Sequence, residues 1–150
     1  KSKSTEESSF SLSIEQLERG FFAEGHNLLY ENFSIEQNLE YYFKLDNYNT
    51  DEFESFFRLL EIQEPVQKPV KELSLGTKQK IVALLVLLSP KKILILDEPT
   101  LGMDSDVKQA FMLALLKTSK ILLISSHESE FFTLFDSRYE CNSQNIVEVG

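Results

Sequence analysis

Cysteine is almost missing from this sequence of 150 residues, in which Cys141 stands alone. A single cysteine excludes an intramolecular disulfide, and a reducing compartment is then the simplest environment for the chain. We expect Cys141 to be an ordinary thiol near the end of the sequence rather than a reactive group.

Long hydrophobic runs are missing as well. The longest unbroken apolar segment extends from Ile81 to Leu88, whereas a helix that crosses a bilayer needs about 20 consecutive apolar residues. The first residues show no secretory signal pattern. We therefore expect a soluble domain in the cytoplasm.

Positive charge is scarce, because 15 Lys and Arg residues stand against 24 Asp and Glu residues, for a net charge of −9. A surface that follows a phosphate backbone needs clustered Lys and Arg, so we expect no nucleic-acid partner. A nucleotide held by backbone amides and Mg²⁺ remains compatible with this charge. The length fits one domain, and an apolar fraction of 42% is sufficient for an ordinary core.

The sequence does contain an alternation of short apolar runs and amphipathic segments after a polar start over residues 1–9, which we expect to be loosely held. Strands are predicted at residues 20–23, 92–96 and 120–127, with weaker patterns at 138–141 and 145–149. Helices are predicted at 34–45, 51–61, 74–89 and 105–117, and another from about 128. Ser34 and Gln37 form a capping-box pattern at the first helix. Strands that alternate with helices indicate an α/β fold with a parallel sheet.

The runs at 92–96 and 120–127 are so uniformly apolar that we expect both strands to be buried, the first with both faces covered. Asp97 and Glu98 end the first strand, and His127 ends the second. Ligands of open α/β sheets bind beyond the carboxyl ends of the strands. There Asp97 can hold Mg²⁺ through its waters, and Glu98 can orient or deprotonate a water molecule. A solvated acidic turn beside a solvated histidine is the alternative interpretation.

A third signal lies upstream in LSLGTKQK, residues 73–80, where a Ser-x-Gly turn opens the long helix. The first turn of a helix offers free amides, the positive end of the helix dipole and here the hydroxyl of Ser74, a combination that can bind phosphate. Its position before ILILDEPTLGMD and ISSHES favours a phosphate-handling site.

Residues from about 19 to 150 resemble the nucleotide-binding domain of ABC transporters without its first third. LSLGT resembles the signature motif, ILILDEPT the Walker B motif, LGMD the D-loop and SSH the H-loop. The segment LYENFSIEQNLEYYFKL is similar to the one that follows the Q-loop in exporter-type ABC ATPases, and FDSRYECNSQNIVEVG resembles the closing β-hairpin.

This resemblance implies a P-loop NTPase-type α/β fold with an inserted helical subdomain over about residues 30–72 and the motifs over 73–150, in one partial domain. It implies ATP and Mg²⁺ as cofactors. Asp97 would coordinate the metal, Glu98 would be the catalytic base and His127 the switch histidine. The residues implied in nucleotide binding are Ser74, Leu75, Gly76, Asp104 and Glu24. Leu75 departs from the first glycine of the signature, and Glu24 stands where the family has glutamine.

The Walker A loop of the family, G-x-x-x-x-G-K-[ST], is not found in the sequence. Its glycines let backbone amides surround the phosphates, and its lysine neutralises their charge. The start KSKST ends like this motif, but Ser2 replaces the glycine, so we interpret it as a coincidence or a remnant. We therefore expect the chain alone to bind ATP weakly and not to hydrolyse it.

In the family, two domains enclose two ATP molecules, each held by the Walker motifs of one subunit and the signature of the other. The resemblance thus implies a second nucleotide-binding domain and a separate transmembrane permease as partners, an export function, and a position at the inner face of the membrane. The alternatives are a non-hydrolytic subunit, an SMC-type chromosome-structural lobe, a ribosome-acting factor and an inactive fragment. Glu98 and His127 argue against the first, and the lack of flanking heptads argues against the second.

Overall fold

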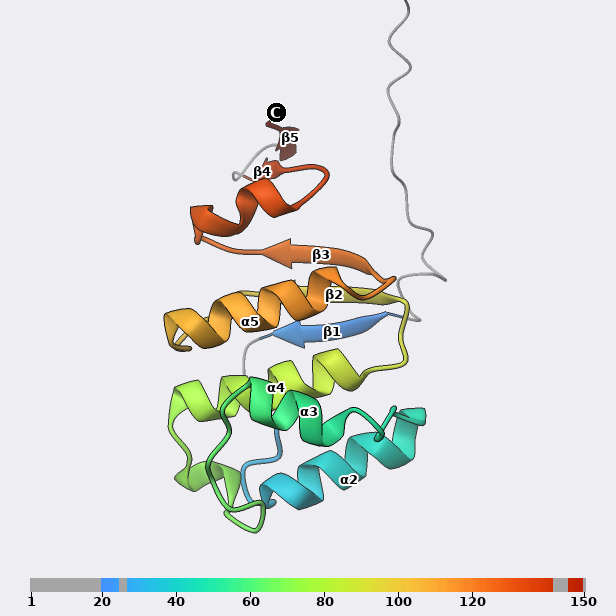
Figure 1. Cartoon of the computed structure of the whole chain (residues 1–150), viewed down its shortest axis with the longest axis vertical. Coiled ribbons are helices and arrows are strands. Elements are labelled where there is room, and N and C mark those ends of the chain that lie inside the picture. Colours follow the sequence, from blue (N-terminus) through green and yellow to red (C-terminus); the bar gives the residue numbers. More distant parts are fainter. Residues whose placement is uncertain (1–19, 25–26, 142–145, 150) are drawn as a thin grey trace, which may run out of the picture.

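Three parallel strands form the sheet that positions the predicted site (Figure 1). They are β1 (Phe21–Glu24), β2 (Ile93–Asp97) and β3 (Ile121–Ser125), in this spatial order. The structure is a computed structural model, and it describes residues 20–24, 27–141 and 146–149. The register aligns Glu24 with Asp97 and Asp97 with Ser125, so the carboxyl ends of the strands meet at one edge.

The helices lie on one face of this sheet and beyond the β1 edge (Figure 1). They are α2 (Ile35–Asp46), α3 (Phe53–Leu59), α4 (Leu75–Leu88) and α5 (Ser105–Leu116), with the 3₁₀ turns η1 (Val70–Glu72) and η2 (Ser129–Leu134). The helix α5 covers a face of the sheet, and α4 lies next to β1. The helix α2 lies on the far side of α4, and α3 contacts both α4 and α5. The helix expected from residue 128 is a 3₁₀ turn, so the predicted α-helix was wrong there.

The helix α4 connects the sheet to α2 and α3. From Ile81 to Leu88 it is apolar on every side, and these side chains are all buried, because the helix packs against β1, α2, α3 and α5 at once. A helix buried on every side needs no polar face. Ser74 caps its first turn and Ser89, followed by Pro90, ends it, as the sequence predicts.

The helices α2 and α3 form where the sequence places them. Ser34 and Gln37 make both hydrogen bonds of the capping box at α2. Asn38 is fully buried and fixes the preceding loop, because its side chain accepts from the amide of Tyr30 at 2.8 Å and donates to the carbonyl of Tyr30 at 3.1 Å. Tyr42 donates to the carbonyl of Leu28 at 2.6 Å, and burial raises the pKa of this phenol to about 12. The aromatic side chains of α3 pack against the core, as expected.

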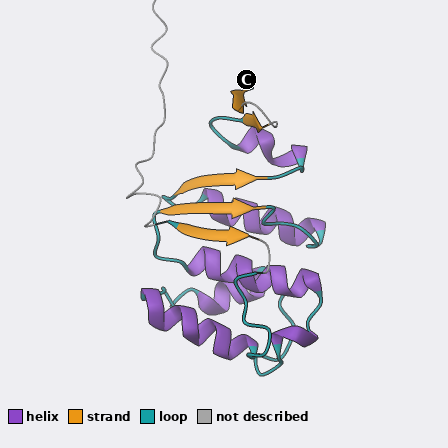
Figure 2. Ribbon diagram, turned by 180° about the vertical axis from the view of Figure 1, so that it is seen from behind, coloured by secondary structure: helices purple, strands orange, loops and turns teal. Residues whose placement is uncertain are grey.

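The burial of the sheet differs from the prediction. No residue of β3 is buried, and Ile121 and Leu123 are each more than a third exposed. In the register, Leu123 shares a face with Ile95 and Phe22, and Phe22 is also exposed. Figure 2 shows this side of the sheet without a helix of the described residues over it. The predicted burial of β3 was therefore wrong for the described part of the chain. The predicted central position of β2 is confirmed, because Ile93 and Leu94, which point to opposite faces, are both buried and only Ile95 is half-buried.

The last strands, β4 (Tyr139–Cys141) and β5 (Ile146–Glu148), pair in antiparallel fashion, as the weak strand patterns predict. The predictions for residues 1–9, which include KSKST, lie outside the described residues. Within the described residues, no helix combines the length and the apolar character that a bilayer crossing requires.

Candidate functional site

The predicted acids lie at the carboxyl edge of the sheet. Asp97 is the last residue of β2, between Glu24 at the end of β1 and Ser125 at the end of β3. The hydroxyl of Ser125 donates a hydrogen bond to the carboxylate of Asp97. Asp97 is exposed, so its carboxylate is oriented by a neighbouring strand and still open to solvent.

Glu98 follows Asp97 with an unusual backbone. Its φ is +44°, a left-handed conformation that costs free energy for a residue other than glycine. Hydrogen bonds hold this backbone on both sides, because its amide donates to the carbonyl of Ser125 at 3.1 Å, and its carbonyl accepts from the amide of Leu101 at 3.1 Å and from the side chain of Gln79 at 3.4 Å. The carboxylate of Glu98 lies 3.6 Å from Nε2 of His127, whose side chain is fully exposed. The structure thus brings Asp97, Glu98 and His127 to one edge.

The predicted signature residues lie at the start of α4. The hydroxyl of Ser74 accepts from the amide of Thr77 at 3.1 Å, so it caps the helix. The first bond of the α-helical pattern runs from the amide of Lys78 to the carbonyl of Ser74, and the amides of Leu75 and Gly76 precede it and are left for another partner. Leu75 itself is 48% exposed.

The turn after β2 contacts this helix start. A Cβ atom on Gly76 would lie 2.4 Å from the carbonyl oxygen of Gly102, so only glycine fits there. Gly102 has a φ of +77°, which also favours glycine. Asp104 occupies the N-cap position of α5, and its carboxylate lies 3.6 Å from Nζ of Lys80. Ser74, Leu75, Gly76 and Asp104 therefore form a cluster of their own.

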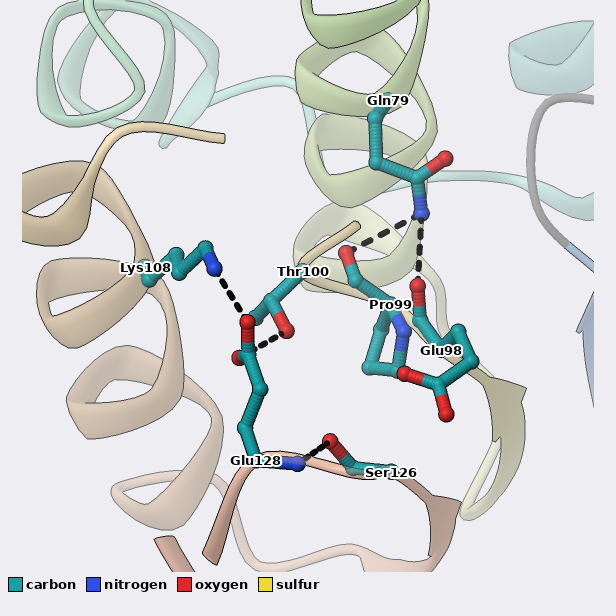
Figure 3. A network of polar contacts seen from close by, with 7 residues as sticks. All are labelled: Gln79, Glu98, Pro99, Thr100, Lys108, Ser126 and Glu128. Atoms are coloured by element: carbon teal, nitrogen blue, oxygen red, sulfur yellow. Dashed lines mark hydrogen bonds and ion pairs between the residues drawn. The ribbon is translucent and has the colours of Figure 1, made fainter. Parts of the chain in front are cut away.

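The two clusters are separate in one chain. Among the described residues, no hydrogen bond or ion pair joins Ser74 or Gly76 to Asp97, Glu98 or His127. Gln79 makes the link between them, because it lies on α4 and donates to the carbonyls of Glu98 at 3.4 Å and Pro99 at 3.0 Å (Figure 3). Its side chain is buried, with the residue only 2% exposed.

A second network joins the residue after His127 to the same turn (Figure 3). The carboxylate of Glu128 accepts from the hydroxyl of Thr100 at 2.7 Å and forms an ion pair with Lys108 of α5. Partial burial raises the pKa of the Glu128 carboxyl, but the hydrogen bonds from Lys108 and Thr100 and the charge of Lys108 outweigh it and lower the pKa below its ordinary value.

Five residues of these contacts are not predicted by the sequence patterns: Gln79, Thr100, Lys108, Ser125 and Glu128. Thr100 and Glu128 are 28 residues apart, and Gln79 and Pro99 are 20 residues apart, so no local spacing could reveal these contacts. The only sequence signal was their position inside or beside motifs that were already recognised.

The carboxyl edge of the sheet offers few ligands for Mg²⁺. Within the described residues, no group of three or more His, Cys, Asp or Glu side chains could hold a metal ion. Mg²⁺ commonly takes only one or two carboxylates and completes its octahedron with waters and substrate phosphates. The exposed carboxylate of Asp97, oriented by Ser125, fits that mode of binding and does not fit an all-protein metal cage.

Comparison with known proteins decides the family. A family model described as ABC transporter matches residues 4–101. This chain belongs to the ABC transporter family. The uncharacterized ABC transporter ATP-binding protein YcbN of Bacillus subtilis is 32% identical over 105 residues, which are 67% of this chain and 34% of YcbN. The ATP-binding cassette sub-family A member 17 of Rattus norvegicus is 31% identical over 108 residues, which are 68% of this chain and 6% of that protein. The chain thus spans about a third of YcbN and a small part of the rat protein.

Solved ABC structures share the fold. An ABC transporter ATP-binding protein of Pyrococcus furiosus superimposes with a TM-score of 0.62 at 22% identity, over 79% of this chain and 60% of that one. A cobalt transport ATP-binding protein gives a TM-score of 0.70 at 20% identity, over 81% of this chain and 47% of that one. The predicted α/β fold with a parallel sheet, of the ABC ATP-binding type, is confirmed.

Proposed function

We propose that this chain supplies the hydrolytic edge and the signature of an ATP-binding subunit that hydrolyses MgATP at the interface between two such subunits. The observation that carries this proposal is the position of Glu98, at the carboxyl end of the central strand and 3.6 Å from His127. A carboxylate and an imidazole on one sheet edge are the groups that a water-activating site needs.

Each residue at the edge has a separate task in this proposal. Asp97 would hold Mg²⁺, which supplies charge neutralisation to the phosphates when bound. The carboxylate of Glu98 accepts a proton from, or orients, the attacking water. The imidazole of His127 is fully exposed and is free to contact the phosphoryl group that is transferred. Glu24, aligned with Asp97 in the sheet, would orient a water molecule of the metal.

The separate position of the signature cluster supports a dimer. In the part of the chain that the structure describes, no hydrogen bond or ion pair joins Ser74 or Gly76 to the acids of the same chain. In this proposal Ser74 and the first amides of α4 would therefore bind the ATP of a second nucleotide-binding domain, with Asp104 beside them. One solved neighbour, similar in fold with a TM-score of 0.59, is a dimeric ATP-binding cassette in a post-hydrolysis state with ADP and Pi.

Membership of the ABC transporter family makes coupling of this subunit to transport plausible. In this proposal α2 and α3 contact a separate transmembrane permease, so that the subunit lies at the inner face of the membrane and drives export. The two exposed aromatic residues Tyr30 and Phe33, together with Tyr41 of α2, are available for this contact.

The test is phosphate release from MgATP, measured on the 150-residue chain and on the longest product of its coding sequence. Because the chain contains no G-x-x-x-x-G-K-[ST] loop, we expect no turnover from the 150 residues by themselves. In the longer product, Glu98→Gln should abolish turnover and preserve ATP binding, whereas Glu130→Gln, an exposed control, should change neither. Turnover that survives Glu98→Gln would contradict the role of this carboxylate.

A further inference from the structure

The side chain of His127 is not fixed by its own contacts. It is fully exposed, and its contact with Glu98 at 3.6 Å is longer than a hydrogen bond. Its position must therefore come from the backbone on either side. On one side Ser125 is fixed in β3, and its carbonyl accepts from the amide of Glu98 at 3.1 Å. On the other side stands Glu128, whose amide donates to the hydroxyl of Ser126 at 3.0 Å.

Glu128 is the residue that anchors this loop to the rest of the site. Its carboxylate binds the hydroxyl of Thr100 and the ammonium of Lys108, and Figure 3 shows both partners converging on it from different elements. Thr100 is only 1% exposed, so its hydroxyl would lose its partner in a buried place without Glu128. Hydrogen bonds to charged groups are the stronger ones, so this contact is more rigid than a surface pair.

The hydrogen bond between Thr100 and Glu128 links the segment that carries Glu98 to the segment that carries His127. Thr100 follows Glu98 by two residues, and Glu128 follows His127 directly. Gln79 holds the turn of residues 98–100 from its other side, through the carbonyls of Glu98 and Pro99. The turn that carries Glu98 in its left-handed conformation is thus bound both to α4 and to the loop of His127.

We propose that Glu128 is a positioning residue, which sets the distance between Glu98 and His127 through Thr100 and Lys108. This inference rests on the proposed function. Glu128 itself does not touch the nucleotide. Its removal should leave ATP binding intact and should impair only the step that needs both Glu98 and His127.

The kinetic test uses the ATPase-competent product of the coding sequence. Glu128→Gln and Thr100→Val should each lower kcat roughly tenfold, since a lost hydrogen bond to a charged group is worth about that factor or more, while KM for MgATP stays within about twofold. Thr100→Ser retains the hydroxyl and should restore most of kcat. In a His127→Ala background, Glu128→Gln should have little further effect, because it acts through His127. Glu130→Gln, at an exposed position two residues further along in η2, is the control.

Amide hydrogen exchange gives an independent measurement. In Glu128→Gln and Thr100→Val, the amides of residues 98–101 and 126–128 should exchange roughly tenfold faster, with those of α2 unchanged. Unchanged exchange, or a normal kcat in Glu128→Gln while Glu98→Gln is inactive, overturns the role of Glu128 and leaves the proposed function standing. An equal loss in both backgrounds of His127 also overturns it, in favour of a general structural role. Absence of any ATPase activity in the longest product overturns both proposals.

Discussion

Gly76 illustrates how a single residue is determined by a contact rather than by its own element. Helix propensity favours alanine over glycine by about 1 kcal/mol in a helix interior. A Cβ at position 76 would however approach the carbonyl oxygen of Gly102 to 2.4 Å, and that oxygen belongs to backbone that cannot rotate away. The contact therefore predicts that alanine at position 76 destabilises the protein, whereas helix propensity predicts that it stabilises the protein.

We expect Gly76→Ala to lower the free energy of unfolding by about 1–3 kcal/mol, as overpacking does. The measurement is urea denaturation followed by circular dichroism. Gln109→Ala, at an exposed position of α5, is the control and should be neutral or slightly stabilising. A stabilised Gly76→Ala variant would mean that the two turns do not meet in solution.

Glu128 makes the free energy of unfolding depend on pH. Its folded pKa lies below the ordinary value of 4.5 because Lys108 and Thr100 stabilise the carboxylate, so the unfolded chain binds its proton more readily. The stabilisation is then fully present above about pH 4.5 and is lost as the pH falls through the lowered folded pKa. The stability difference between the parent and Glu128→Gln should be largest near neutral pH and should shrink on acidification.

Urea unfolding of both proteins at a series of pH values from neutral to acid checks this dependence. In a Lys108→Met background the same substitution should have a weaker pH dependence, because the ammonium that favours the carboxylate is gone. A difference that stays constant down to strongly acid pH would show that the ion pair does not form.

At the scale of the elements, short-range capping decides where α2 begins. The hydroxyl of Ser34 accepts from the amide of Gln37 at 3.1 Å, and the side chain of Gln37 accepts from the amide of Ser34 at 2.9 Å. Both bonds satisfy donors that the helix leaves free at its start. Since they join residues three apart, they depend little on the rest of the fold.

Ser34→Ala should therefore destabilise the protein by about 1 kcal/mol, the usual cost of a lost N-cap. Thermal unfolding measures it, and faster amide exchange in the first turn of α2 should accompany it. Ser55→Ala, at an exposed position inside α3, removes the same hydroxyl where it caps no helix, and it should leave the free energy of unfolding unchanged. Equal effects of the two substitutions would contradict the capping argument.

At the scale of the whole molecule, α4 holds the sheet and the other helices together. Its contacts extend to β1, α2, α3 and α5, and Leu84 at its centre is fully buried. Because both sides of the molecule pack on one helix, unfolding of the sheet should also expose α2 and α3. We expect cooperative unfolding as a single unit.

Leu84→Ala should cost about 2–5 kcal/mol through lost burial and a cavity, a large part of the roughly 5–15 kcal/mol that a domain has in total. Unfolding followed by far-ultraviolet circular dichroism and by tyrosine fluorescence should give coincident transitions, shifted equally. Leu113→Ala in α5, where the side chain is 46% exposed, should cost much less. Separate transitions for the two probes would show that α4 does not couple the two parts.

The local elements of this protein are determined by the sequence by itself. The capping box of α2, the start and end of α4, and the central apolar strand with Asp97 and Glu98 at its end all follow from short-range patterns, because their hydrogen bonds and side-chain periodicities involve near neighbours. The parallel order of the strands also follows from them, and it places Asp97, Glu98 and His127 on one edge.

Only the tertiary structure decided how this edge is held. Three contacts join residues that are 19 to 28 positions apart: Gln79 with residues 98 and 99, Thr100 with Glu128, and Gly76 with Gly102. The spacing of residues along the chain carries no information about these contacts. The exposure of β3 was hidden for the same reason. The apolar residues of a strand indicate that its faces are more stable when buried, whereas the elements packed around the strand determine whether each face is covered.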